Sequence, residues 1–159
     1  DMSQPERFDL TYVDRDNQRR RPIMIHRTVL GSIERFFGIL IEHFAGKYPL
    51  WLAPVQAVVL PINDDLAPYA GEVRDGLLDA GLRVELDDRA ESLNKKVRES
   101  QLRQIPLILT IGAKEQAAGT LSVRTLDGNV RYGVAREAFL DTVQAHIRDR
   151  KLDLTIFGD

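Results

Sequence analysis

One histidine in an apolar segment is the first residue whose type could do chemistry. His26 ends the stretch Pro22–His26, and a neutral imidazole is a good ligand for Zn²⁺. The other two histidines, His43 and His146, lie at no ligand spacing from it, and the chain has no cysteine. A metal site would therefore need ligands from outside this chain, and composition alone favours a structural or surface role for His26.

A glycine followed by a helix start could bind an anion at Gly31–Arg35. Glycine lets the backbone approach a ligand closely, and the N-terminus of a helix attracts negative charge. Arg35 falls one turn into the predicted helix, where it could face a phosphate or stack on a planar base. A solvated arginine paired with a carboxylate is the simpler interpretation, and no Walker-type, GxGxxG or GxSxG motif accompanies it.

Residues 89–104 gather positive charge around one predicted helix. Such a stripe can follow a phosphate backbone. An exposed helix with ion pairs at i,i+4 spacing would contain the same residues, and it is the more ordinary interpretation. The basic residues are Arg89, Lys95, Lys96, Arg98 and Arg103, and the acidic ones include Glu91 and Glu99.

Glu115 and Arg124 are the fourth group. Glu115 follows a turn at Gly112, and Arg124 lies on a short predicted strand. Together they could read guanine, because a carboxylate accepts from its Watson–Crick N–H groups and a guanidinium donates to O6 and N7. The sequence does not establish that the two side chains converge.

Two predicted units position these groups. A β-like segment at 22–26 precedes a helix that begins near Ser32 and ends near Gly46. The helix follows from apolar residues at i, i+3, i+4, i+7, i+8 and i+11, namely Ile33, Phe36, Phe37, Leu40, Ile41 and Phe44. One strand and one helix bury too little surface to be stable alone, so this unit should dock on a missing part or on the second domain.

The second unit, after the linker Trp51–Pro54, reads as a small α/β domain with a mixed sheet and the order β-α-β-α-β-β-β-α. Asp127-Gly128-Asn129 is a strong hairpin turn between its last two strands. The predicted strands are 55–60, 82–86, 106–111, 121–125 and 130–132, and the predicted helices are 66–80, 91–104 and 136–150.

Composition excludes several classes of protein. The 159 residues carry 24 acidic and 22 basic side chains, and a net charge of −2 argues against a non-specific polyanion binder. No apolar run approaches the length of a membrane span, and the first residues do not form a signal peptide, so we expect a cytoplasmic protein without membrane contact. The start without methionine suggests a fragment of a longer chain.

The segment Met24–Leu40 strongly resembles motif 3 of the class II aminoacyl-tRNA synthetases in its threonyl form, through the string His-Arg…Gly-Ser-x-Glu-Arg-Phe. The similarity runs from about Tyr12 to Arg150 without an obvious insertion. It continues in Trp51–Gln56, Ala80–Val84, Lys96–Glu99 and Ile105-Pro106. The resemblance implies that residues 1–52 are the end of an antiparallel class II catalytic core. Residues 53–159 would be a three-layer α/β/α anticodon-binding domain.

The resemblance also implies roles for residues of the first unit. His26 matches one of three protein ligands of a catalytic Zn²⁺, whose other ligands, a Cys and a His, would lie upstream. That Zn²⁺ would hold the amino and hydroxyl groups of threonine and so exclude valine. Ser32 matches a residue lining the aminoacyl site. Arg35 matches the motif 3 arginine that contacts ATP, bound with Mg²⁺, and favours in-line attack on its α-phosphate.

In the second unit, the resemblance assigns Glu115 and Arg124 to the middle G of the threonine anticodon and places Arg98 and Arg89 on the RNA side. The family commonly has Arg-Asn-Glu-Lys-Ile-Gly where this chain has Arg-Ala-Glu-Ser-Leu-Asn at 89–94. Ala90 offers no side-chain hydrogen bond, so we expect reading of the third anticodon base to be weaker or rerouted.

The resemblance therefore predicts part of a threonine–tRNA ligase, which activates threonine with ATP and transfers it to tRNA(Thr), and whose full-length form would be a homodimer. We expect this segment to be inactive by itself, because motifs 1 and 2 are not in it. The alternative is a free-standing tRNA- or RNA-binding regulatory module derived from the synthetase. A third possibility, a plain α/β domain without an RNA role, is separated from both by binding to a threonine-anticodon stem-loop.

Overall fold

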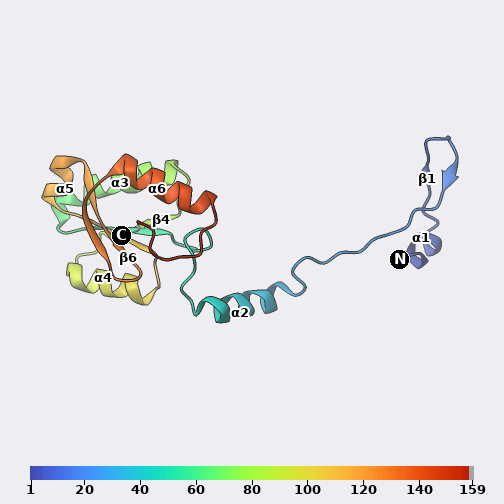
Figure 1. Cartoon of the computed structure of the whole chain (residues 1–159), viewed down its shortest axis with the longest axis horizontal. Helices are drawn as coiled ribbons and strands as arrows, with labels where there is room; N and C mark the ends of the chain where they lie inside the picture. Colours follow the sequence, from blue (N-terminus) through green and yellow to red (C-terminus); the bar gives the residue numbers. More distant parts are fainter. Residues whose placement is uncertain (158–159) are drawn as a thin grey trace. The chain divides into compact units, whose positions relative to one another are not determined.

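The computed structural model describes residues 1–157 and divides the chain into two compact units, Asp1–His43 and Phe44–Asp159 (Figure 1). The first unit contains a short helix α1 (Ser3–Arg7), a hairpin of β1 (Tyr12–Val13) and β2 (Arg19–Arg20), and the longer helix α2 (Ile33–Phe44). The helix predicted from the apolar stripe is confirmed as α2. None of its residues is buried, and Phe37 and Ile41 are each 54% exposed.

The strand predicted over residues 22–26 is wrong, because this segment has no regular secondary structure. A strand is stabilised by the hydrogen bonds of a neighbouring strand, and within residues 1–157 no strand pairs with this segment. Its apolar residues Ile23 and Ile25 are 66% and 88% exposed.

The second unit is built on a five-stranded mixed sheet with the order β4-β3-β5-β6-β7. The three strands β4, β3 and β5 are parallel, whereas β6 and β7 add to them in antiparallel fashion. The predicted mixed sheet is thus confirmed. Its strands are β3 (Ala57–Pro61), β4 (Val84–Leu86), β5 (Leu107–Ile111), β6 (Thr120–Thr125) and β7 (Val130–Ala135).

Helices cover both faces of this sheet, as the predicted three-layer arrangement requires (Figure 1). The 3₁₀ turn η1 (Asp64–Leu66) leads into α3 (Ala67–Asp79), which packs with α6 (Arg136–Arg148) on one face in the larger apolar core. On the other face α4 (Leu93–Leu102) packs against a smaller core around Val58, Leu60 and Ile108. A further helix, α5 (Ala113–Ala118), was not expected, since six residues without a buried side chain show no apolar period.

Alternation along β5 and β6 decides which face receives polar side chains. Leu121 and Val123 point into the larger core, so Ser122 and Arg124 point to the face of α4. The register pairs Ser122 with Thr110 and Arg124 with Ile108, which places all four residues on that face. The sheet thereby presents a hydroxyl and a guanidinium beside α4.

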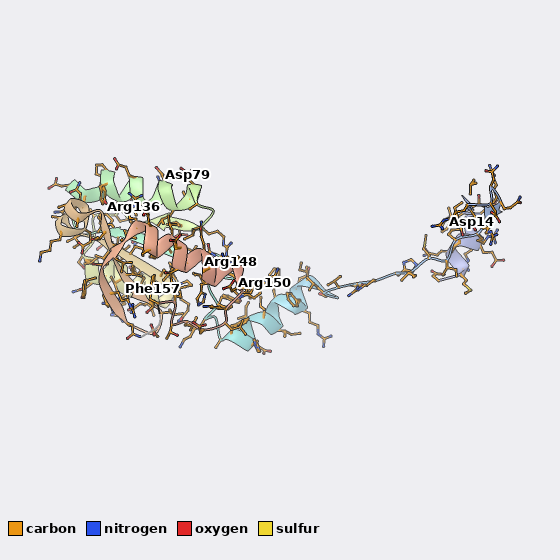
Figure 2. The ribbon with its side chains drawn as sticks, turned by 45° about the horizontal axis from the view of Figure 1, so that its top comes forward. Asp14, Asp79, Arg136, Arg148, Arg150 and Phe157 are labelled. Atoms are coloured by element: carbon orange, nitrogen blue, oxygen red, sulfur yellow. The ribbon has the colours of Figure 1, made fainter. Side chains whose placement is uncertain are left out.

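The predicted linker Trp51–Pro54 is fixed to the second unit by polar contacts. The buried Gln56 amide donates to the carbonyl of Leu50 at 2.9 Å and accepts from the backbone N–H of Arg83 at 2.9 Å. The Arg83 guanidinium donates to the carbonyls of Ala53 and Trp51. At the end of α6, Arg150 lies 5.9 Å from the centre of the Trp51 ring, and Phe157 stacks on the buried Phe139; Arg150 and Phe157 are labelled in Figure 2.

Candidate nucleic-acid interface

A pocket of about 260 Å³ opens on the face of the sheet that α4 covers. Its volume lies just below the range of about 300–1,000 Å³ typical of small-molecule sites. We call it the Glu115 pocket. It is lined by Ile62, Leu93, Asn94, Val97, Thr110, Glu115, Ser122, Arg124, Val130 and Tyr132. The structure therefore brings Glu115 and Arg124 to one pocket, which the sequence did not establish.

The Glu115 carboxylate is oriented by two donors that carry no charge. Its Oε1 accepts from the Ser122 hydroxyl at 2.7 Å, and its Oε2 accepts from the Gly112 backbone N–H at 3.0 Å. The Ser122 hydrogen bond first, and backbone hydrogen bonds after it, hold the pKa of Glu115 below its ordinary value of 4.5. The side chain is thus ionised at neutral pH, and each oxygen retains lone pairs for a ligand.

Gly112 makes room for this carboxylate. A Cβ at position 112 would lie 2.8 Å from Oε2 of Glu115 and 2.9 Å from Cδ1 of Ile62, which is closer than real side chains approach. Gly112 immediately precedes α5, so Glu115 lies in the first turn of the helix and its carboxylate folds back onto the N-cap N–H. The unexpected helix α5 therefore places the carboxylate.

Arg124 is half-buried on β6 and extends into the same pocket. Its Nη1 donates to the carbonyl of Gly128 in the hairpin turn, at a long 3.4 Å. Within residues 1–157, Arg124 forms no ion pair with a carboxylate. Its positive charge is available to an acceptor on a ligand.

A second polar cluster lies on the other side of α4, next to β4, and we call it the Arg89 cluster. The Arg89 guanidinium donates to both carboxylate oxygens of Asp87, at 2.8 and 2.7 Å, and to Glu99 at 2.7 Å. Nearby, Arg103 pairs with Glu85 through two hydrogen bonds. These arginines hold the pKa values of Asp87 and Glu85 below their ordinary values.

The predicted basic helix is therefore mostly neutralised. Lys95 forms an i,i+4 ion pair with Glu91 at 2.6 Å, and Lys96 is buried. Arg98 is exposed and has no ion pair within the described residues, but it does not line the Glu115 pocket. The predicted i,i+4 ion pair is confirmed for Lys95 alone; Arg89 and Arg103 are paired as well, but with carboxylates at other spacings. Within the part of the chain that the structure describes, Arg98 presents an unpaired charge on this helix.

The predicted residues of the first unit are all exposed. His26 Nε2 lies 3.1 Å from a carboxylate oxygen of Asp1. Ser32 precedes α2 as its N-cap: its carbonyl accepts from the Phe36 N–H, and its hydroxyl donates to Glu34 at 2.8 Å. The Arg35 side chain makes no hydrogen bond or ion pair within residues 1–157.

The described residues do not hold a metal ion by themselves. Among residues 1–157 no three His, Cys, Asp or Glu side chains gather into a possible metal site. His26 contributes one exposed imidazole, whereas a Zn²⁺ site takes three or four protein ligands. Likewise, none of the helices described over this range is long and apolar enough to cross a membrane.

Sequence reasoning did not assign Ser122, Asn94 or Tyr132, three polar residues of the Glu115 pocket, to this site. Ser122 alternates with Arg124 on one strand, and that two-residue spacing was a usable signal. Asn94 and Tyr132 come from α4 and β7, and their approach to Glu115 depends on tertiary structure that no local pattern indicates.

Comparison with known families decides what this domain is. A family model described as "Anticodon binding domain" matches residues 56–146, which contain every element from β3 to α6 except the last two residues of α6. The chain belongs to the anticodon-binding domain family. A second model, "tRNA synthetase class II core domain (G, H, P, S and T)", matches residues 1–44 and thus the first unit.

Proteins related to this chain confirm its resemblance to the threonyl-tRNA synthetases. It is 66% identical over 157 residues to a threonine–tRNA ligase of Desulfatibacillum aliphaticivorans and 62% identical over 158 residues to one of Desulfosudis oleivorans. Both alignments cover 99% of this chain but 25% of the relative, so the chain spans about a quarter of their length.

A solved structure supports the fold as well. The RNA-binding domain of threonyl-tRNA synthetase from Cryptosporidium parvum Iowa II matches with a TM-score of 0.75 and 36% identity. The match covers 92% of this chain and 37% of that chain.

Proposed function

We propose that the second unit reads the middle guanine of the threonine anticodon in tRNA(Thr). The observation that carries this proposal is the convergence of Glu115 and Arg124 in one pocket, with the carboxylate oriented by uncharged donors. An ionised carboxylate is an acceptor only, and guanine presents two adjacent N–H donors on its Watson–Crick edge. Arg124 then donates to O6 and N7 on the neighbouring edge.

This chemistry distinguishes guanine from the other bases. Adenine presents an acceptor, N1, where guanine presents a donor, so its lone pair would face the Glu115 carboxylate. A pyrimidine is smaller and lacks N7, so Arg124 would lose an acceptor. A wrong base therefore leaves a charged group of the pocket without a partner, which is the strongest form of discrimination a polar site can offer.

The experiment is binding of the 159-residue chain to an anticodon stem-loop with the threonine sequence, compared with a stem-loop in which only the middle base is changed. We expect weaker binding for each substituted stem-loop. Equal binding of all stem-loops, or no binding, would overturn the proposal.

We further propose that the whole protein is a threonine–tRNA ligase that works in the cytoplasm as a homodimer, using threonine, ATP and Mg²⁺. Similarity of nearly the whole chain to threonine–tRNA ligases supports this. Residues 1–52 would belong to the catalytic core, with Arg35 contacting ATP and Ser32 lining the aminoacyl site. The exposed, uncommitted guanidinium of Arg35 is compatible with that role.

His26 would supply one ligand of a Zn²⁺ whose other protein ligands lie elsewhere in the whole protein. The described residues offer no second histidine or cysteine near it, so this chain alone should not retain the metal. The second unit would be the anticodon-binding domain, extending from residue 53 to 159. Arg98 and Arg89 would lie on its RNA side.

The catalytic part of this proposal predicts that the 159-residue chain alone gives no threonine-dependent exchange between ATP and pyrophosphate. Full-length protein should give that exchange, and the Arg35→Ala variant of it should not. Exchange catalysed by the isolated chain would contradict the assignment of the missing motifs to the rest of the protein.

A further inference from the structure

Tyr132 is an exposed aromatic residue at the rim of the Glu115 pocket. It lies on β7, lines the pocket beside Val130 and Arg124, and is 78% exposed. Within residues 1–157 its ring contacts no other aromatic ring, and its hydroxyl makes no hydrogen bond. Packing of the described chain therefore gives no reason for a large apolar ring at this position.

The backbone at Tyr132 departs from regular strand pairing. The register between β6 and β7 shifts between Leu121 and Val123, so that Tyr132 and Gly133 together oppose Ser122. Gly133 has φ +66°, in the left-handed region that favours glycine. A bulge of this kind turns a side chain out of the regular pleat and is frequent beside functional sites.

Asn94 lines the same pocket from the first turn of α4. Its side chain is exposed, and within the described residues its amide donates and accepts no hydrogen bond. The same pocket is lined by the apolar side chains of Leu93, Val97 and Ile62. An apolar floor, an open aromatic face and an uncommitted amide together match a nucleobase, which has an apolar face and a polar edge.

We propose that Tyr132 is a stacking platform for the nucleotide next to the guanine and that Asn94 reads the edge of that nucleotide. This inference rests on the proposed function, since it takes the guanine to be held by Glu115 and Arg124. With the guanine in this pocket of about 260 Å³, the adjacent base would lie at its rim, where the Tyr132 ring is open to solvent. The platform has no charged group of its own, which favours a base over a phosphate.

The test uses the anticodon stem-loop with 2-aminopurine placed on one side of the guanine or the other, because stacking quenches the fluorescence of that base. The wild-type chain should quench one of the two probes. Tyr132→Leu should weaken binding roughly 5- to 150-fold and abolish the quenching, whereas Tyr132→Phe, which keeps the ring, should change affinity by less than about threefold. Tyr12→Leu, at an exposed tyrosine of the first unit, is the matched control and should behave as wild type.

A Tyr132→Leu chain that binds and quenches as wild type would overturn the stacking role. Thermal melting checks that the variant is folded, as expected for a residue with 78% of its surface exposed. Asn94→Ala should reduce the preference among bases at the quenched position and leave the preference for guanine intact. An unchanged preference there would overturn the edge-reading role.

Failure of this inference and failure of the proposed function give different results. If Arg124→Ala loses selectivity for guanine while Tyr132→Leu binds as wild type, the guanine site stands and the platform is wrong. If neither variant changes binding and the middle base has no effect, the anticodon proposal itself is wrong.

Discussion

The Glu115 pocket and the Arg89 cluster use the same types of charged residue on opposite sides of α4, with opposite results. In the Arg89 cluster a guanidinium donates to two carboxylates, so the charges are neutralised within the chain. In the Glu115 pocket the carboxylate is held by a hydroxyl and a backbone N–H, and Arg124 contacts a carbonyl. Uncharged partners orient a charged group without neutralising it, so the group still attracts a ligand.

This comparison predicts which arginine matters most for RNA binding. Arg124→Ala should weaken binding to the threonine-anticodon stem-loop by about 1–3 kcal/mol and relax selectivity at the middle base. Arg124→Lys should recover part of the affinity but little selectivity, because an ammonium cannot donate in the planar, paired geometry of a guanidinium. Titration of each variant against stem-loops with all four middle bases measures both effects.

The matched variant is Arg89→Ala. Because Arg89 is already paired with Asp87 and Glu99, we expect a smaller loss of affinity and no change in guanine selectivity. If Arg89→Ala relaxed selectivity as much as Arg124→Ala did, the contrast between neutralised and presented charge would be wrong.

The second prediction moves the Glu115 carboxylate instead of removing a side chain. Gly112→Ala places a Cβ 2.8 Å from Oε2 of Glu115, so the carboxylate must shift from the N–H that orients it. We expect guanine selectivity to fall by about 1 kcal/mol, the typical worth of a lost hydrogen bond, with the fold retained because φ at this position is −112°. Binding to stem-loops with guanine or adenine in the middle is the measurement.

The control for this substitution is Gly71→Ala on α3, where a Cβ meets nothing within 4 Å. That variant should bind RNA as wild type and be slightly more stable, since alanine favours a helix by about 1 kcal/mol over glycine. Equal loss of selectivity in both variants would point to a general effect on the domain rather than to the position of Glu115.

The third prediction concerns pH. The Ser122 hydroxyl and backbone N–H groups lower the pKa of Glu115 from 4.5, so at pH 4.5 more than half of the carboxylate is ionised and most of its charge is lost at lower pH. Its contribution to stability has the same sign: it is present above pH 4.5 and lost as the pH falls through the lowered pKa. Guanine selectivity should therefore persist at pH 4.5, where an unperturbed glutamate is half protonated, and be lost at lower pH.

Ser122→Ala removes the larger cause of the lowered pKa, so the pH at which selectivity is lost should rise. Ser122→Thr keeps the hydroxyl on a residue suited to a strand and should retain the wild-type profile. The measurement is the ratio of affinities for guanine and adenine stem-loops across the acid range. A profile that does not move in Ser122→Ala would show that this hydrogen bond does not control the charge of Glu115.

The sequence predicted the local features of this chain better than the contacts between distant residues. Apolar periodicity and the Asp127-Gly128 turn are local, and they predicted α2, the mixed sheet and the last hairpin correctly. The strand at 22–26 was wrong, because β structure needs a partner strand that a local pattern does not specify. Convergence of Glu115 and Arg124 was not predictable from spacing, since it depends on the register of β5 with β6 and on the short helix α5.

The smallest predicted effect comes from releasing Arg89. Glu99→Gln removes one of its two carboxylate partners, so part of its charge becomes available to phosphate. Because exposed ion pairs contribute little, we expect affinity for any stem-loop to rise by about two- to fivefold at low salt and the gain to vanish as salt is added.

Glu137→Gln on α6 changes the net charge equally without touching Arg89, so the difference between these variants isolates the release of the guanidinium. A gain confined to stem-loops with guanine in the middle would contradict the prediction, because a phosphate contact cannot distinguish one base from another.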